Sequence, residues 1–100
     1  MLHHIVFWKL KPTANGQTSA VNIAELTNQL NSLKGKVPEL ISLAVGPDLN
    51  RSPAAWDIAL YTTFRNKEDL DKYQVHPEHK KVVTFVQSVV AERAVVDFED

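Results

Sequence analysis

The 100-residue sequence predicts one α+β domain in which a four-stranded antiparallel sheet carries helices on one face. Four segments rich in β-branched and aromatic residues indicate strands, and the segments between them repeat apolar residues at helical spacing. Their order is β-α-β-β-α-β, which is the ferredoxin-like split βαβ arrangement. One hundred residues are enough for a single domain, residues 1–100, and too few for two.

The first strand and the first helix occupy the N-terminal third of the chain. Leu2 to Leu10 is rich in β-branched and aromatic residues and predicts a strand. Residues 11–17 contain proline, asparagine and glycine and predict a loop. Thr18 or Ser19 can cap the helix that follows, and Gly35 supplies the left-handed residue that ends it. The apolar stripe of this helix consists of Ile23, Leu26, Leu30 and Leu33.

Two more strands follow, separated by a polar loop. Leu40 to Val45 predicts the second strand, which Gly46-Pro47 closes, and Trp56 to Phe64 predicts the third. Residues 48–55 between them hold asparagine, serine and proline.

A broken helical region and a last strand complete the fold. A short helix begins at Arg65 or Asn66 and stops at His76, because a residue before a proline avoids helical geometry. Pro77 suits the first turn of a second helix. The residues from Ala91 to Phe98 alternate and predict the fourth strand.

The predicted sheet is apolar on both faces. Val6 and Trp8 share one face of the first strand, whereas Ile5 and Phe7 share the other. A sheet with one solvated face alternates apolar with polar residues, and the helices can cover only one face. A second copy of the chain is the simplest cover, so we expect a homodimer. The alternative is an unusually apolar exposed face.

Composition excludes several partners and chemistries. Eleven basic and twelve acidic side chains give a net charge of −1 without a basic cluster, so nucleic acid is not an expected partner. The absence of cysteine excludes disulfide and thiol chemistry. No segment approaches the roughly 20 apolar residues of a membrane span, so no membrane contact is expected. The N-terminus lacks signal-peptide features, and a cytoplasmic location is expected.

Several motifs resemble one known family over nearly the whole chain. His3 to Lys11 (HHIVFWKLK) is similar to the opening strand of the Dabb family, the stress-responsive dimeric α/β-barrel proteins. Tyr73 to His79 (YQVHPEH) resembles that family's Y-x-x-H-P-x-H segment. Val95 to Phe98 and Leu43 to Gly46 resemble two further strands. The resemblance implies a homodimer with a central barrel and a cavity between sheet and helices in each subunit.

The resemblance also implies candidate site residues. In a plant polyketide cyclase of this family, which needs no cofactor, a tyrosine and a histidine act on a linear poly-β-keto substrate. These positions fall on Tyr73 and His79, and the strand-one histidine falls on His4. Trp8 replaces a smaller aliphatic residue of the cyclase and could fill the cavity. The implied lining is Val6, Trp8, Leu26, Leu30, Leu60, Val82 and Phe85.

Each polar candidate has a chemical and a structural interpretation. A helix N-terminus favours the neutral imidazole of His79, which can then act as a base; alternatively, His79 packs at a junction and hydrogen-bonds a carbonyl. Tyr73 can orient a carbonyl or donate to an enolate, or bury its ring and keep its hydroxyl in water. His4 would orient His79 or a ligand. Arg93 and Asp97 share one side of the last strand and are expected to pair.

No metal or other cofactor is expected. His76 and His79 are three residues apart and His4 could be a third ligand, but the region lacks a carboxylate pair. His76 is expected to cap a helix instead.

Two functions follow from the sequence. The first is a stress-related or small-molecule-binding homodimer whose small ligand is apolar or a β-keto compound. The alternative is a cofactor-independent enzyme of cyclase, isomerase or lyase type, with His79 as general base and Tyr73 and His4 assisting. A cavity of a few hundred cubic ångströms ending at His79 would favour the enzyme, and a filled interior would favour the first function.

Overall fold

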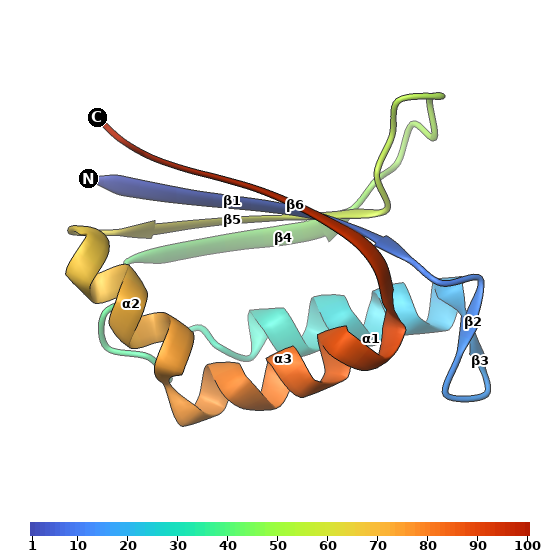
Figure 1. The fold of residues 1–100 in the computed structure, drawn as a ribbon, viewed down its shortest axis with the longest axis horizontal. Helices are drawn as coiled ribbons and strands as arrows, with labels where there is room; N and C mark the ends of the chain where they lie inside the picture. Colours follow the sequence, from blue (N-terminus) through green and yellow to red (C-terminus); the bar gives the residue numbers. More distant parts are fainter.

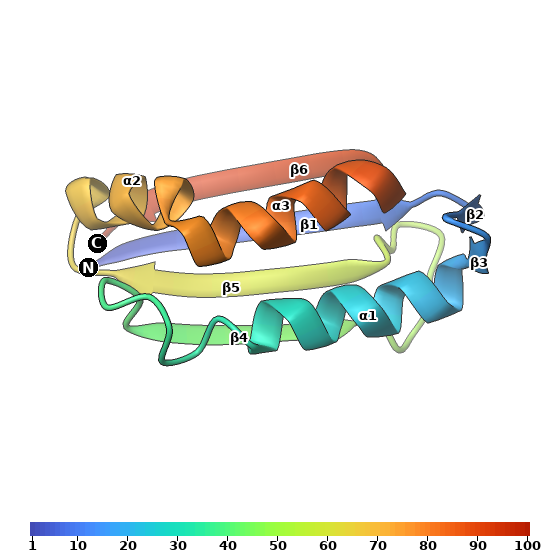
Figure 2. The same cartoon turned by 90° about the horizontal axis from the view of Figure 1, so that it is seen from below.

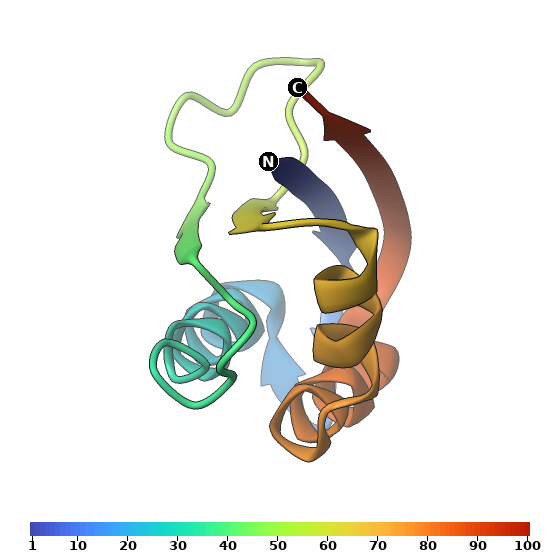
Figure 3. The ribbon, with the colours of Figure 1, turned by 90° about the vertical axis from the view of Figure 1, so that its left-hand side faces the viewer.

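The computed structural model describes residues 1–100 and places all three helices on one face of a four-stranded antiparallel sheet (Figures 1 and 2). The strand order is β4-β5-β1-β6. The strands are β1 (Leu2–Leu10), β4 (Ser42–Pro47), β5 (Ile58–Phe64) and β6 (Val90–Glu99). The helices are α1 (Ser19–Asn31), α2 (Lys67–Val75) and α3 (Pro77–Val89). α1 lies on the β4 side of the sheet, whereas α2 and α3 lie on the β6 side (Figure 3).

The predicted loop at residues 11–17 contains a small β-hairpin, β2 (Thr13–Ala14) and β3 (Gln17–Thr18). Asn15 and Gly16 form its two-residue turn with φ values of 54° and 73°. An Asn-Gly pair readily adopts two consecutive left-handed residues, which a tight hairpin turn requires. The loop prediction was therefore wrong for this segment, although the Asn-Gly pair carried the signal for a hairpin.

Helix α1 begins as predicted and ends earlier than predicted. The Thr18 hydroxyl accepts a hydrogen bond from the Val21 amide at 3.4 Å and so caps the first turn. The α-helix ends at Asn31, and tighter turns continue the chain through Lys36. Gly35, with φ of 79°, lies in these turns rather than at the end of the α-helix.

The break between α2 and α3 is at the predicted place. Asn66 caps α2, because its side-chain oxygen accepts a hydrogen bond from the Asp69 amide at 3.0 Å. His76 has an extended backbone between the helices, and its Nδ1 accepts from the Glu78 amide at 3.1 Å. Pro77 is the first residue of α3, where no amide donor is needed. His76 therefore caps α3, as expected from the sequence.

The hydrophobic core lies between the sheet and the helices, and the opposite face of the sheet is uncovered. The even-numbered residues of β1 from Leu2 to Leu10 are buried against the helices. On the outer face, Phe7 is 38% exposed, Tyr61 45%, Val96 59% and Phe98 45%. The sheet is thus apolar on both sides, as the sequence predicted.

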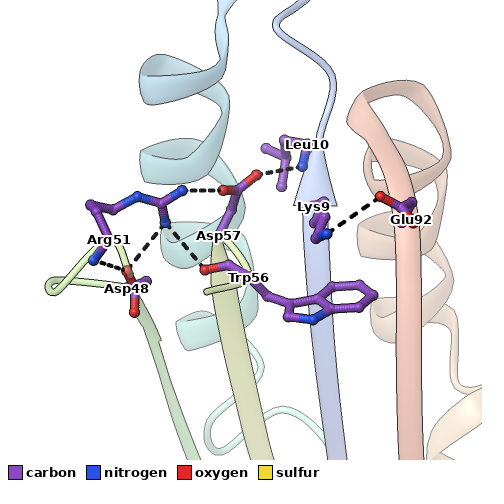
Figure 4. A network of polar contacts seen from close by, with 7 residues as sticks. All are labelled: Lys9, Leu10, Asp48, Arg51, Trp56, Asp57 and Glu92. Atoms are coloured by element: carbon purple, nitrogen blue, oxygen red, sulfur yellow. Dashed lines mark hydrogen bonds and ion pairs between the residues drawn. The ribbon is translucent and has the colours of Figure 1, made fainter. Parts of the chain in front are cut away.

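The connection between β4 and β5 rises on the outer side of the sheet, away from the helices (Figure 1). The Arg51 guanidinium donates to Asp48 at 3.3 Å and to Asp57 at 2.9 Å, and Asp57 also accepts from the Leu10 amide at 2.8 Å (Figure 4). The Lys9 ammonium lies 4.8 Å from the centre of a Trp56 ring. These contacts hold the loop upright over the end of the sheet.

None of the helices combines the length and the apolar character that crossing a membrane requires.

Candidate functional site

A cavity of about 420 Å³ lies between the helix-facing side of the sheet and α3. This volume is in the usual range for small-molecule sites. Its walls are largely apolar, with imidazole, amide and guanidinium groups among them. Strands β1, β5 and β6 provide His4, Val6, Trp8, Leu60 and Arg93. The three helices provide Leu30, Gln74, His79, Val82, Val83, Val86 and Gln87.

His79 lies in the first turn of α3 and presents a neutral imidazole to the cavity. Its Nδ1 is 3.2 Å from the carbonyl oxygen of Gln74. A carbonyl only accepts, so Nδ1 carries the proton and Nε2 keeps its lone pair. Burial lowers the pKa of His79, and nearby positive charge lowers it further, against the opposing effect of the Gln74 hydrogen bond. No protein atom hydrogen-bonds Nε2, which leaves it available to a ligand.

His4 is the second imidazole of the cavity. It is buried on β1, and its Nδ1 is hydrogen-bonded to a carboxylate oxygen of Asp97. The strand register places Asp97 on β6 directly across from His4. The ring N–H donates to this carboxylate oxygen, so Nδ1 of His4 carries a proton. No hydrogen bond joins Nε2 of His4 to the protein. Such a carboxylate orients a histidine ring by fixing one of its nitrogens.

The predicted pairing of Asp97 with Arg93 was wrong. Asp97 bonds His4, whereas Arg93 lies opposite Trp8 in the β1–β6 register. Arg93 and Asp97 are four positions apart along the strand, about 13 Å of backbone. A shared strand face is therefore not enough for contact, and the neighbouring strand supplies the partner.

Tyr73 packs behind the two imidazoles rather than lining the cavity. Its ring centroid lies 4.2 Å from that of His79 and 6.4 Å from that of His4. The side chain is fully buried, and its hydroxyl has no hydrogen-bond partner. Burial raises the pKa of this phenol. The expected water-exposed hydroxyl is contradicted, because α2 turns the whole side chain inward.

The predicted apolar lining is found in the cavity except at two positions. Leu26 is fully buried in the core, and Phe85 packs against the core without reaching the cavity. Trp8 borders the cavity rather than filling it, and its indole nitrogen is buried without a partner. The residues found in the lining are Val6, Trp8, Leu30, Leu60 and Val82.

Sequence reasoning missed the other members of the lining. They are Gln74, Val83, Val86, Gln87 and Arg93. The four-residue step from Val82 to Val86 was the available signal for the α3 face. His76, a candidate metal ligand in the sequence, is held in its capping contact and does not line the cavity.

Comparison with known proteins identifies the family. Residues 2–100 match the model of the family described as Stress responsive A/B Barrel Domain. The chain is 32% identical over 85 residues to a stress-response A/B barrel domain-containing protein of Arabidopsis thaliana, and the match covers 83% of this chain and 30% of that relative. The chain spans less than half the length of the curated relatives it matches.

Solved structures show the same fold. A dimeric protein of unknown function from Bacteroides fragilis has a TM-score of 0.85 and 28% identity, with 99% of this chain and 95% of that chain covered. A hydroxynitrile lyase from Passiflora edulis has a TM-score of 0.78 and 22% identity, with 97% and 90% covered. The sheet order, the broken helix and the match over residues 2–100 agree, and this chain belongs to the stress-responsive A/B barrel (Dabb) family.

Proposed function

We propose that this chain works as a homodimer in which each subunit binds a small, largely apolar organic molecule. The observation that carries the proposal is the cavity of about 420 Å³, whose apolar walls hold a few polar groups. Apolar walls supply affinity, and a small number of polar groups orient a ligand.

The uncovered outer face of the sheet supports the homodimer. Phe7, Tyr61, Val96 and Phe98 are all partly exposed on that face, next to one another across β5, β1 and β6. Two sheets that pack face to face through a two-fold axis would bury this surface on both subunits. The Bacteroides fragilis protein of the same fold is described as dimeric.

Blocking the cavity tests ligand binding. The probe is 4-phenylbutan-2-one, a neutral ketone with an apolar tail, titrated into the protein by calorimetry. We expect binding by the parent and loss of binding by Val86→Phe, because the larger ring enters the cavity from α3. Val21→Phe is the matched control, since Val21 is exposed on α1 outside the lining. Equal affinity of parent and Val86→Phe would place the ligand elsewhere.

The two imidazoles favour a second function, cofactor-free proton transfer. His79 and His4 each have Nδ1 held by an acceptor and Nε2 free, and both line one cavity. Neutral His79 would take a proton from a carbon next to a carbonyl. The C–H electron pair moves into the carbonyl and forms an enolate. Its oxygen accepts from the Nε2–H of His4 in the imidazolium form, in which Nδ1–H still bonds Asp97. The same fold carries a lyase in Passiflora edulis.

Deuterium exchange tests this step without knowledge of the natural reaction. Exchange of the α-proton of a β-keto thioester in D₂O is followed by NMR. His79→Ala should slow the exchange by a hundredfold or more, the usual contribution of a general base. Tyr73→Phe should change it little, because the ring that packs on His79 remains and the lost hydroxyl does not line the cavity. Lys80→Ala is the control, since Lys80 is exposed on α3 outside the lining. Unchanged exchange in folded His79→Ala would remove the enzyme proposal.

A further inference from the structure

The cavity is lined by cationic and neutral groups and by no carboxylate. Its titratable groups are His4, His79 and Arg93, although the chain holds twelve acidic residues. The nearest acidic residues of β6 are engaged elsewhere. Glu92 lies 3.7 Å from the Lys9 ammonium, and Asp97 bonds His4. The lining therefore contains one permanent positive charge, that of Arg93, and no carboxylate of its own.

Arg93 is the unmatched charge of this lining. Its guanidinium makes no ion pair and no side-chain hydrogen bond within the chain. The residue is exposed on β6, so its long side chain lies at the rim where the cavity meets water. Its charge is near enough to His79 to contribute to the lowered pKa of that imidazole. The positive charge of Arg93 therefore faces the cavity and is not neutralised by an acidic group of the protein.

A neutral donor, the side-chain amide of Gln87, lines the cavity together with Arg93. Gln87 belongs to the last turns of α3, which leads directly into β6. Trp8 lies directly opposite Arg93 across the β1–β6 ladder and borders the cavity, but its indole N–H is buried within the protein. Trp8 lies about 13 Å of backbone along β1 from His4, so Arg93 and the His4 imidazole occupy different parts of the cavity.

We propose that the ligand of this cavity carries an anionic group, a carboxylate, which Arg93 binds at the rim with help from Gln87. The inference rests on the proposed small-molecule binding and specifies the chemical class of that ligand. A planar guanidinium binds a carboxylate through two parallel hydrogen bonds. The apolar part of the molecule then lies against Val83 and Val86, and its other end reaches the imidazoles. An apolar acid fits this distribution of charge, whereas an organic cation would be repelled by the positive charge of Arg93.

A matched pair of probes tests the charge of the ligand. 4-Phenylbutyrate and 4-phenylbutanamide have the same carbon skeleton and differ by one negative charge. Calorimetry at low salt should show roughly tenfold tighter binding of the carboxylate by the parent, the lower range expected for a charge-assisted contact near water. Added salt should reduce this preference, because the contact lies at the rim. Arg93→Gln should lose this preference and bind both probes with equal affinity.

Lys80→Gln is the matched control. Lys80 is an exposed cation on α3 outside the lining, so its loss changes net charge without changing the cavity. This variant should keep the carboxylate preference. Equal affinity of the parent for both probes, or a preserved carboxylate preference in Arg93→Gln, overturns the role of Arg93 and leaves cavity binding intact. Binding of neither probe by the parent overturns the cavity-binding proposal and the carboxylate inference with it.

Discussion

Removal of the Tyr73 hydroxyl should stabilise the protein. This hydroxyl is buried without a hydrogen-bond partner between α2 and the sheet. Such a group costs about 1–3 kcal/mol, because it loses its hydrogen bonds to water on folding. Tyr73→Phe keeps the ring against His79 and Phe64 and removes only the oxygen. The small space left behind offsets part of the gain, so we expect the free energy of unfolding to rise by about 1 kcal/mol.

Urea unfolding followed by circular dichroism measures this change. Parent and variants must be compared at one protein concentration, because the stability of a dimer depends on concentration. The slope of the free energy against urea should stay the same, and only the midpoint should move. Tyr61→Phe is the control with the opposite expected sign. Its hydroxyl is 2.7 Å from Nδ1 of His3, and its loss should cost about 0.5–1 kcal/mol.

A destabilised Tyr73→Phe would refute the reasoning. A loss of about 1 kcal/mol or more would mean that the hydroxyl has a hydrogen-bond partner in solution, either a buried water or one of the two imidazoles. The result expected here is a more stable variant, because only the unpaired hydroxyl is lost.

Three further predictions concern the interface, the cavity wall and pH. In sedimentation, the parent should have twice the 11.3 kDa mass of its chain. Phe7→Lys places a charge on the outer face of the sheet and should shift the measured mass toward 11.3 kDa. If Phe7→Lys forms a dimer as tight as that of the parent, this face is not the interface. Trp8→Leu should lower the free energy of unfolding, measured by urea unfolding, by about 2 kcal/mol. This is less than the cost of truncating an aromatic residue to alanine, because leucine keeps part of the contact. An unchanged free energy of unfolding would show that Trp8 contributes little packing. Because the pKa of His79 is lowered in the folded protein, the unfolded chain binds a proton at His79 more readily than the folded one. The contribution of His79 to stability is therefore fully present above about pH 6.5, and it is lost as pH falls through the folded pKa. His79→Gln should flatten this acid-side decline in urea midpoints, and an unchanged pH dependence would contradict it.

The element order could be predicted because its signals are local. A β-branched strand, an apolar stripe on a helix and the His76-Pro77 break each depend on neighbours within one or two turns of chain. The structure agrees with these predictions, including Thr18 as helix cap and His76 as the cap of α3. That the sheet is apolar on both faces could also be predicted from the sequence, because successive side chains of a strand point to opposite faces.

The contacts of the site depend on how distant segments are aligned. His4 and Asp97 are 93 residues apart, and only the β1–β6 register places them opposite each other and leaves Arg93 opposite Trp8. The orientation of α2 buries the Tyr73 hydroxyl, which its own helix pattern did not reveal. Local propensity decides which residues form strands and helices, whereas hydrogen bonding across strands and packing between layers select the partner of each side chain. For this reason the fold could be read from the chain, but the pairing of its charged groups required the tertiary structure.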